Sequence, residues 1–165
     1  MINTSYQQKY FGIFGEENVP LLPNDMQGKG MREMNQEYLQ KIQNIGDKIF
    51  EISESIKSID TKVKISDQEL KGHYQVFLEA ITNYQKCKVD LLDINPPDKV
   101  QQEHTELANA TQLFIDGAEL IAKGIDLNTL SVNEEIILKG KDLQKQGEDQ
   151  TVKLANEIVR NFVKD

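Results

Sequence analysis

The feature that most constrains the fold is a row of apolar residues that recurs every three or four positions. From Tyr38 onward the spacing is 4-3-4-3-4-3-4. This heptad pattern is typical of one long helix whose apolar seam packs against other helices. Isoleucine at both core positions of the heptad favours three or more packed helices over a two-stranded pair. The row consists of Met31, Met34, Tyr38, Ile42, Ile45, Ile49, Ile52, Ile56, Ile59 and Val63.

This isoleucine seam has two interpretations. It can form one wall of an intramolecular core, which is the simpler reading and the one we favour. It can also face another copy of the chain, so that the protein self-associates into a longer coiled coil. The two differ in whether the isoleucines are buried within one chain.

A capping box marks the start of the second helix. The side chain of Ser66 can accept a hydrogen bond from the amide of Glu69, and the carboxylate of Glu69 can accept one from the amide of Ser66. Ile65 before the box and Leu70 after it can pack together as a hydrophobic staple. The preceding helix must end only a few residues earlier. A connection this short makes the two helices antiparallel neighbours.

Similar signals bound two further helices. Asn95 suits an N-cap, Pro96 the first helical position and Gly124 a C-cap, and Ser131 to Glu134 read as a second capping box. Helices are therefore expected over residues 31–62, 66–93, 97–123 and 132–163. The predicted fold is all-α: an antiparallel up-down bundle of about four long helices with an irregular N-terminal arm.

The arm, residues 1–30, differs in composition from the bundle, residues 31–165. Two prolines and two late glycines argue against a continuous helix there. Its aromatic side chains either contact a partner protein or fold back over one end or one groove of the bundle, and both alternatives stay open. The candidate partner-binding residues are Tyr6, Tyr10, Phe11, Phe14, Leu21 and Leu22.

Four glycines in the second half of the chain form two pairs spaced by seven residues, Gly117 with Gly124 and Gly140 with Gly147. Each glycine inside a helix costs about 1 kcal/mol relative to alanine, so a compensating contact is expected. We interpret them as close helix–helix contacts together with a C-cap. The alternative is a last helix that is broken or bent near Gly147.

One stretch of the chain resembles a known group of proteins. The residues that carry the resemblance are Pro96, Pro97, His104, Ala110, Phe114, Gly117, Gly124 and the glycine echo at Gly147. In this region, about residues 95 to 150, the chain is similar to uncharacterised small helical-bundle modules of Gram-positive bacteria. Such modules are often exported or lipid-anchored. The resemblance implies no enzymatic activity and no ligand.

Net charge and hydropathy make some classes of binding partner improbable. The net charge is −8 and the pI is about 4.9, which argues against nucleic acid and against an anionic membrane surface. No apolar run approaches about 18 residues, so no membrane span is expected. Because no signal peptide is recognisable, we expect the protein to be located in the cytoplasm. The alternative is export by a route that needs no N-terminal signal.

Candidate catalytic residues are few. The two histidines, His73 and His104, form no Glu-x-x-His motif, and Cys87 between Lys86 and Lys88 has no histidine near enough to act as a base. We therefore expect no catalytic residue, no metal site and no cofactor. The expected function is protein–protein interaction or scaffolding; the alternative is an enzyme or small-ligand carrier with a site inside the bundle.

Overall fold

The structure is a computed structural model that describes residues 29–56 and 65–163; residues 1–28, 57–64 and 164–165 lie outside the described part. The elements run in the order α2 (Lys29–Ser55), α3 (Asp67–Leu92), the 3₁₀ turn η2 (Asp98–Val100), α4 (Gln101–Lys123), β1 (Ile125–Asp126), β2 (Ser131–Val132) and α5 (Glu134–Val163). The predicted all-α fold with four long helices is confirmed.

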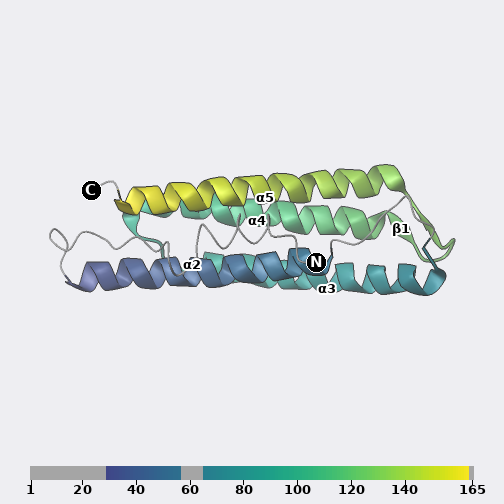
Figure 1. Ribbon diagram of the computed structural model, residues 1–165, viewed down its shortest axis with the longest axis horizontal. Helices are drawn as coiled ribbons and strands as arrows, with labels where there is room; N and C mark the ends of the chain where they lie inside the picture. Colours follow the sequence, from purple (N-terminus) through teal and green to yellow (C-terminus); the bar gives the residue numbers. More distant parts are fainter. Residues whose placement is uncertain (1–28, 57–64, 164–165) are drawn as a thin grey trace, which may run out of the picture.

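The helices lie side by side along one long axis, and their directions alternate (Figure 1). Consecutive helices are spatial neighbours: α2 packs on α3, α3 on α4, and α4 most closely on α5. As a result α2 begins, and α5 ends, at the same end of the bundle.

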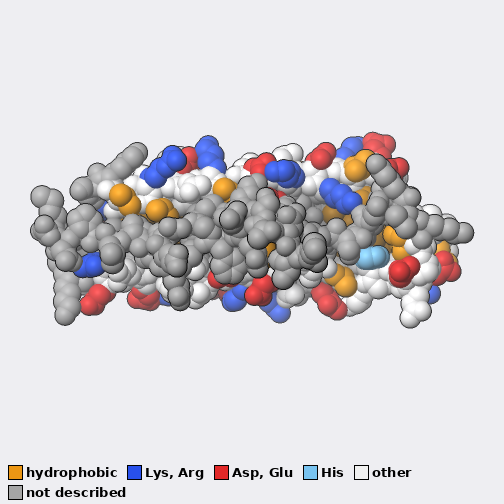
Figure 2. All heavy atoms as spheres, viewed as in Figure 1, with side chains coloured by type: hydrophobic (Ala, Val, Ile, Leu, Met, Phe, Trp, Pro, Cys, Tyr) orange, Lys and Arg blue, Asp and Glu red, His pale blue; other side chains and the backbone are white. Residues whose placement is uncertain are grey.

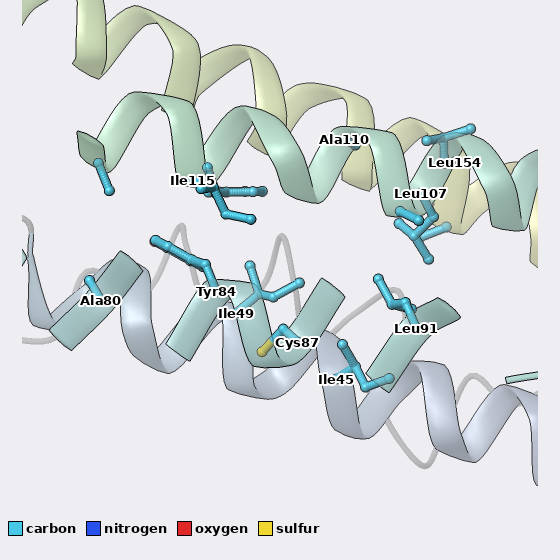
Figure 3. Close-up of a cluster of buried hydrophobic side chains, with 14 of the residues drawn as sticks. Ile45, Ile49, Ala80, Tyr84, Cys87, Leu91, Leu107, Ala110, Ile115 and Leu154 are labelled. Atoms are coloured by element: carbon cyan, nitrogen blue, oxygen red, sulfur yellow. The ribbon is translucent and has the colours of Figure 1, made fainter. Parts of the chain in front are cut away.

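The core is built from the seam of α2 and the inner faces of the other three helices (Figure 3). From Tyr38 to Ile56 the heptad row is buried, except that Ile52 is only partly buried, whereas Met34 is exposed. Four aromatic side chains of the other helices are also buried in this core; they are Phe77, Tyr84, Phe114 and Phe162. The described part of the seam thus faces a core within a single chain.

The capping box before α3 is present as predicted. The amide of Glu69 donates to Ser66 Oγ at 3.3 Å, and the amide of Ser66 donates to Glu69 Oε2 at 2.9 Å. These bonds satisfy amides that the first turn of a helix leaves without intrahelical acceptors.

The predicted start of α5 at Ser131 is wrong by two residues. Ser131 pairs with Asp126 in a short antiparallel hairpin, and its hydroxyl lies 2.7 Å from Thr129 Oγ1. The cap is Asn133, whose Oδ1 accepts from the amide of Ile136 at 3.2 Å. The Asp126 carboxylate stabilises the turn of the hairpin because it accepts hydrogen bonds from the amides of Asn128 and Thr129. Ser131 therefore lies in the hairpin and does not cap the helix.

The start of α4 also lies later than predicted. Neither Asn95 nor Pro96 occupies the expected cap positions; the chain makes the 3₁₀ turn η2 after Pro97, and the α-helix begins at Gln101. The amide of Val100 donates to the carbonyl of Pro97 at 3.0 Å. A 3₁₀ turn at a helix start is a common way to satisfy the first amides.

The glycines serve close packing of α4 against α5. A Cβ at Gly140 would lie 2.6 Å from the carbonyl oxygen of Gly117, and one at Gly117 would lie 2.7 Å from that of Gly140. Gly124 ends α4 as predicted, and it also lies against Ile137. The alternative of a break near Gly147 is wrong, because α5 runs without interruption from Glu134 to Val163.

Candidate functional site

The predicted partner-binding residues of the arm, Tyr6 to Leu22, lie outside the described part of the chain, so their role stays a prediction. Within the described part, two surface features have the character of a binding site. One is the seam between α2 and α5, and the other is an apolar row on α3. Neither was singled out from the sequence.

The helices α2 and α5 lie apart over much of their length. These two helices scarcely approach each other, in contrast to the other neighbouring pairs. A cavity of about 260 Å³ opens there, and all four helices line it. Its apolar lining consists of Phe50, Ile56, Phe77, Phe114 and Ile121.

The α5 side of the cavity is polar. Its lining residues there are Lys141, Gln144, Lys145 and Glu148. Lys145 Nζ lies 2.6 Å from the carboxylate of Asp149, and this hydrogen bond raises the pKa of Lys145. The side-chain nitrogen of Gln144 is buried without a hydrogen-bond partner. The cavity therefore combines an apolar floor with a charged rim.

At the cavity wall a partly buried hydroxyl pair links α2 to α3. Ser53 Oγ donates to the carbonyl of Ile49 at 2.9 Å, so the hydroxyl of Tyr84, 2.8 Å away, is the donor to Ser53. The Tyr84 ring stacks on Phe114 with centroids 5.3 Å apart. Burial raises the pKa of Tyr84 well above its ordinary value. This phenol stays protonated and acts as a structural donor.

A second buried network joins the helices at the other end of the bundle. His104 Nε2 lies 2.8 Å from the carbonyl of Leu91 and donates to it, which leaves Nδ1 to accept from Tyr38 Oη at 3.1 Å. Burial lowers the pKa of His104, and the hydrogen bond to Leu91 offsets this only in part. The imidazole is neutral and fixes the positions of α2, α3 and α4 relative to one another.

Cys87 is buried in the core beside Ile45 and Leu91 (Figure 3). Its burial raises the pKa of the thiol, which keeps the sulfur in its less nucleophilic form. His73 lies in the first turns of α3 and His104 in the first turns of α4, at opposite ends of these antiparallel helices. Over residues 29–56 and 65–163, no group of three or more His, Cys, Asp or Glu residues is placed to hold a metal ion.

The apolar row on α3 faces away from the core. Leu78, Val89 and Leu92 are 38%, 55% and 61% exposed. Their spacing of 11 and 3 residues keeps them on one face of a helix, at an angle to the core positions Phe77, Tyr84 and Leu91. Apolar residues out of phase with the core pattern were the signal in the sequence that could have revealed this row.

Comparison with family models, with curated proteins and with solved structures finds no match to this chain. The resemblance to Gram-positive helical modules therefore stays a prediction. None of the described helices combines the length and apolar character that crossing a membrane requires.

Charged side chains on the described surface are mixed in sign. On the face that Figure 2 displays, acidic and basic side chains alternate over the bundle without gathering into one patch. Several of them form ion pairs between successive turns of one helix, such as Lys41 with Glu37 and Lys139 with Glu135. Such exposed pairs contribute little to stability and mainly keep the surface solvated.

Proposed function

We propose that this protein acts without catalysis, as a scaffold or interaction protein that binds another protein through the apolar row on α3. The observation that carries the proposal is the exposure of Leu78, Val89 and Leu92 on one face. Single exposed apolar residues are ordinary on protein surfaces, but an aligned set favours contact with a partner.

The row has the dimensions of a helix-binding surface. From Leu78 to Leu92 it covers 14 residue steps, about 21 Å along α3, with the exposed polar residues Thr82 and Gln85 between Leu78 and Val89 on the same face. A partner helix with apolar residues every three or four positions would bury all three side chains at once. At about 25 cal/mol per Å² of buried apolar surface, burial of each of these side chains would contribute favourably to binding.

The state of the buried titratable groups supports a role without catalysis. Tyr84 and His104 are already engaged in hydrogen bonds that hold the helices together. The thiol of Cys87 is buried, and burial raises its pKa. Tyr84 and His104 thus have structural tasks, and Cys87 is buried, although side chains of these types can serve as base or nucleophile elsewhere.

Affinity capture from the native host tests the proposal when it is done with matched variants of the full chain. Wild-type protein is compared with the double variant Val89→Ser/Leu92→Ser, and with Leu138→Ser, which alters a similarly exposed leucine on α5. We expect a partner that is retained by wild type and by Leu138→Ser and lost by the double variant. If all three proteins retain the same partner equally, the apolar row on α3 is not its binding surface.

A second candidate function, a carrier of small molecules, has one observation in its favour. The cavity between α2 and α5 joins an apolar lining to polar groups on α5, a combination common in ligand sites. A fluorescent apolar anion titrated into the full chain tests it. Saturable binding that is weakened by Phe50→Ala and left intact by Val89→Ser would favour the carrier; the absence of saturable binding would exclude it for this class of ligand.

The proposal includes two further predictions, one on the cellular location of the protein and one on its relationship to other proteins. We place the protein in the cytoplasm, with export that needs no N-terminal signal as the alternative. We also retain the likeness to Gram-positive helical modules as the expected relationship. Fractionation of the native host with an antibody to the protein tests the location, and its recovery from the culture medium alone would contradict the cytoplasmic assignment.

A further inference from the structure

The described helices leave one side of the bundle incompletely closed. In an up-down bundle the first and last helices also pack together and complete the ring. Here α2 and α5 meet through the rings of Tyr38 and Phe162, whose centroids are 6.0 Å apart, at the end where α2 begins. Toward the other end the helices scarcely approach, and the cavity beside Phe50 opens between them.

Side chains that border this seam are nevertheless buried. On α2, Leu39 and Gln43 are 4% and 9% exposed, and their spacing places them in line with Phe50. On α5, Glu148 and Ala155 are 7% and 0% exposed and lie seven residues apart. Helices in direct contact have axes about 8–10 Å apart, and α2 and α5 lack the close approach that such contact brings. Direct contact between α2 and α5 therefore accounts for little of this burial, although Leu39 and Ala155 also belong to the common core.

The opposite side of α2 is already used by α3. Ile45 belongs to the same buried cluster as Cys87 and Leu91 (Figure 3), and Lys48 Nζ lies 3.7 Å from the carboxylate of Asp90. At 100° per residue, Leu39 and Gln43 are turned by more than about 100° from Ile45. Leu39 and Gln43 are therefore buried on a side of α2 other than the one that Ile45 occupies.

We propose that the aromatic part of the N-terminal arm, residues 6–14, lies in the seam between α2 and α5 of the same chain. This segment brings four aromatic rings and Ile13 to an apolar lining that includes Phe50 and Phe114. Glu16 and Glu17 follow after Gly15, and two lysines, Lys141 and Lys145, stand on the α5 rim together with Glu148. The proposal is independent of the apolar row on α3.

The arm is long enough to reach the cavity. It joins α2 at Lys29, at the end where Tyr38 and Phe162 meet. Phe50 lies about 32 Å from Lys29 along α2 at 1.5 Å per residue. Phe14 precedes Lys29 by 15 residues, which span up to about 50 Å when extended. Tethering to α2 also keeps the local concentration of the arm high, which favours it over a free partner.

Photo-crosslinking of the full chain tests the proposal. Phe50 is replaced by p-benzoylphenylalanine, and a matched protein carries the same probe at Val89, on the outer face of α3. Each is mixed with an equal amount of its ¹⁵N-labelled form, irradiated and digested with trypsin. Cleavage after Lys9 and Lys29 releases a peptide that contains Tyr10, Phe11 and Phe14.

We expect the probe at position 50 to capture this peptide or the one before it, with both halves of each product carrying the same isotope. The probe at position 89 should capture neither. A crosslinked product with one ¹⁵N-labelled and one unlabelled peptide would show that the arm of a second copy fills the seam. Capture of residues 57–64 alone, or no capture of the arm, would also overturn the proposal.

Thermal unfolding of full-chain point variants provides a second measurement. Phe14→Ser should lower Tm by roughly 5 °C or more, because it removes a large buried side chain. Gln8→Ser, a polar change in the same segment, should shift Tm by less than about 1 °C. If the two variants melt together at the wild-type temperature, the arm does not fill the seam.

Discussion

Replacement of Gly140 by alanine should destabilise the bundle, although alanine is the better helix former. In an exposed helix the change would stabilise by about 1 kcal/mol, because glycine is the more costly residue to order. At position 140 the new methyl group would lie 2.6 Å from the carbonyl oxygen of Gly117, 2.6 Å from Ile121 Cγ1 and 3.0 Å from the amide nitrogen of Ile121. Carbon atoms do not approach backbone atoms this closely without displacement.

The size of the effect follows from what must move. Two of the three opposing atoms belong to the backbone of α4, so no change of rotamer relieves the contact and the helices must separate. Overpacking of this kind costs about 1–3 kcal/mol, and the gain in helix propensity offsets part of it. We expect a net loss of about 1–2 kcal/mol, equivalent to roughly 3–6 °C in Tm for a chain of this size.

Gly72→Ala is the matched control. Gly72 also lies inside a helix, α3, but a Cβ there meets no atom within 4 Å. This variant should gain about 0.5–1 kcal/mol. Urea unfolding of wild type and both variants, followed by circular dichroism, gives the comparison. If Gly140→Ala is as stable as Gly72→Ala, the account of the contact between α4 and α5 is wrong.

Three further predictions concern the cap, the core and the buried histidine. Ser66→Ala should cost about 1 kcal/mol in urea unfolding, since it removes the acceptor for the Glu69 amide; an unchanged midpoint would count against the cap. Ile49→Ala, at a fully buried seam position, should cost about 2–5 kcal/mol and clearly more than Ile52→Ala at the partly buried one; equal losses would contradict the burial of the seam. Because the pKa of His104 is lower in the folded chain than in the unfolded one, the unfolded chain binds the proton first, and stability should fall as pH drops below about 6.5. His104→Gln should lack this decrease between about pH 7.5 and pH 5.5; the same decrease in both proteins would assign it to other groups.

The parts of the fold that depend on neighbouring residues could be predicted from the sequence. The capping box at Ser66 needs only four consecutive residues, and the heptad row of α2 needs only its own periodicity. The start of α5 was misjudged because Ser131 has a competing local partner. The side chain of Asp126 organises the turn before it, and Ser131 then pairs in the hairpin.

The cavity and the exposure of the apolar row depend on how the helices pack together. No single segment of the sequence reveals this packing. The cavity is lined by residues from all four helices, so no spacing within one helix reveals it. Its formation depends on the separation of α2 from α5, whereas the glycines that draw α4 and α5 together were visible in the sequence. The apolar row on α3 could not be recognised from periodicity alone, because only the structure shows that Leu78, Val89 and Leu92 are exposed.

The affinity of a captured partner for variants of α3 tests the central claim most directly. Wild type, Leu92→Ala, Val89→Ala and Leu138→Ala are titrated with the partner by calorimetry, with all four proteins first shown to unfold at the same temperature. The account predicts that Kd rises about tenfold or more for the two α3 variants, equivalent to about 1.4 kcal/mol, and stays unchanged for Leu138→Ala. Unchanged affinity for the α3 variants, or an equal loss for Leu138→Ala, would contradict the claim that this row is the interaction surface.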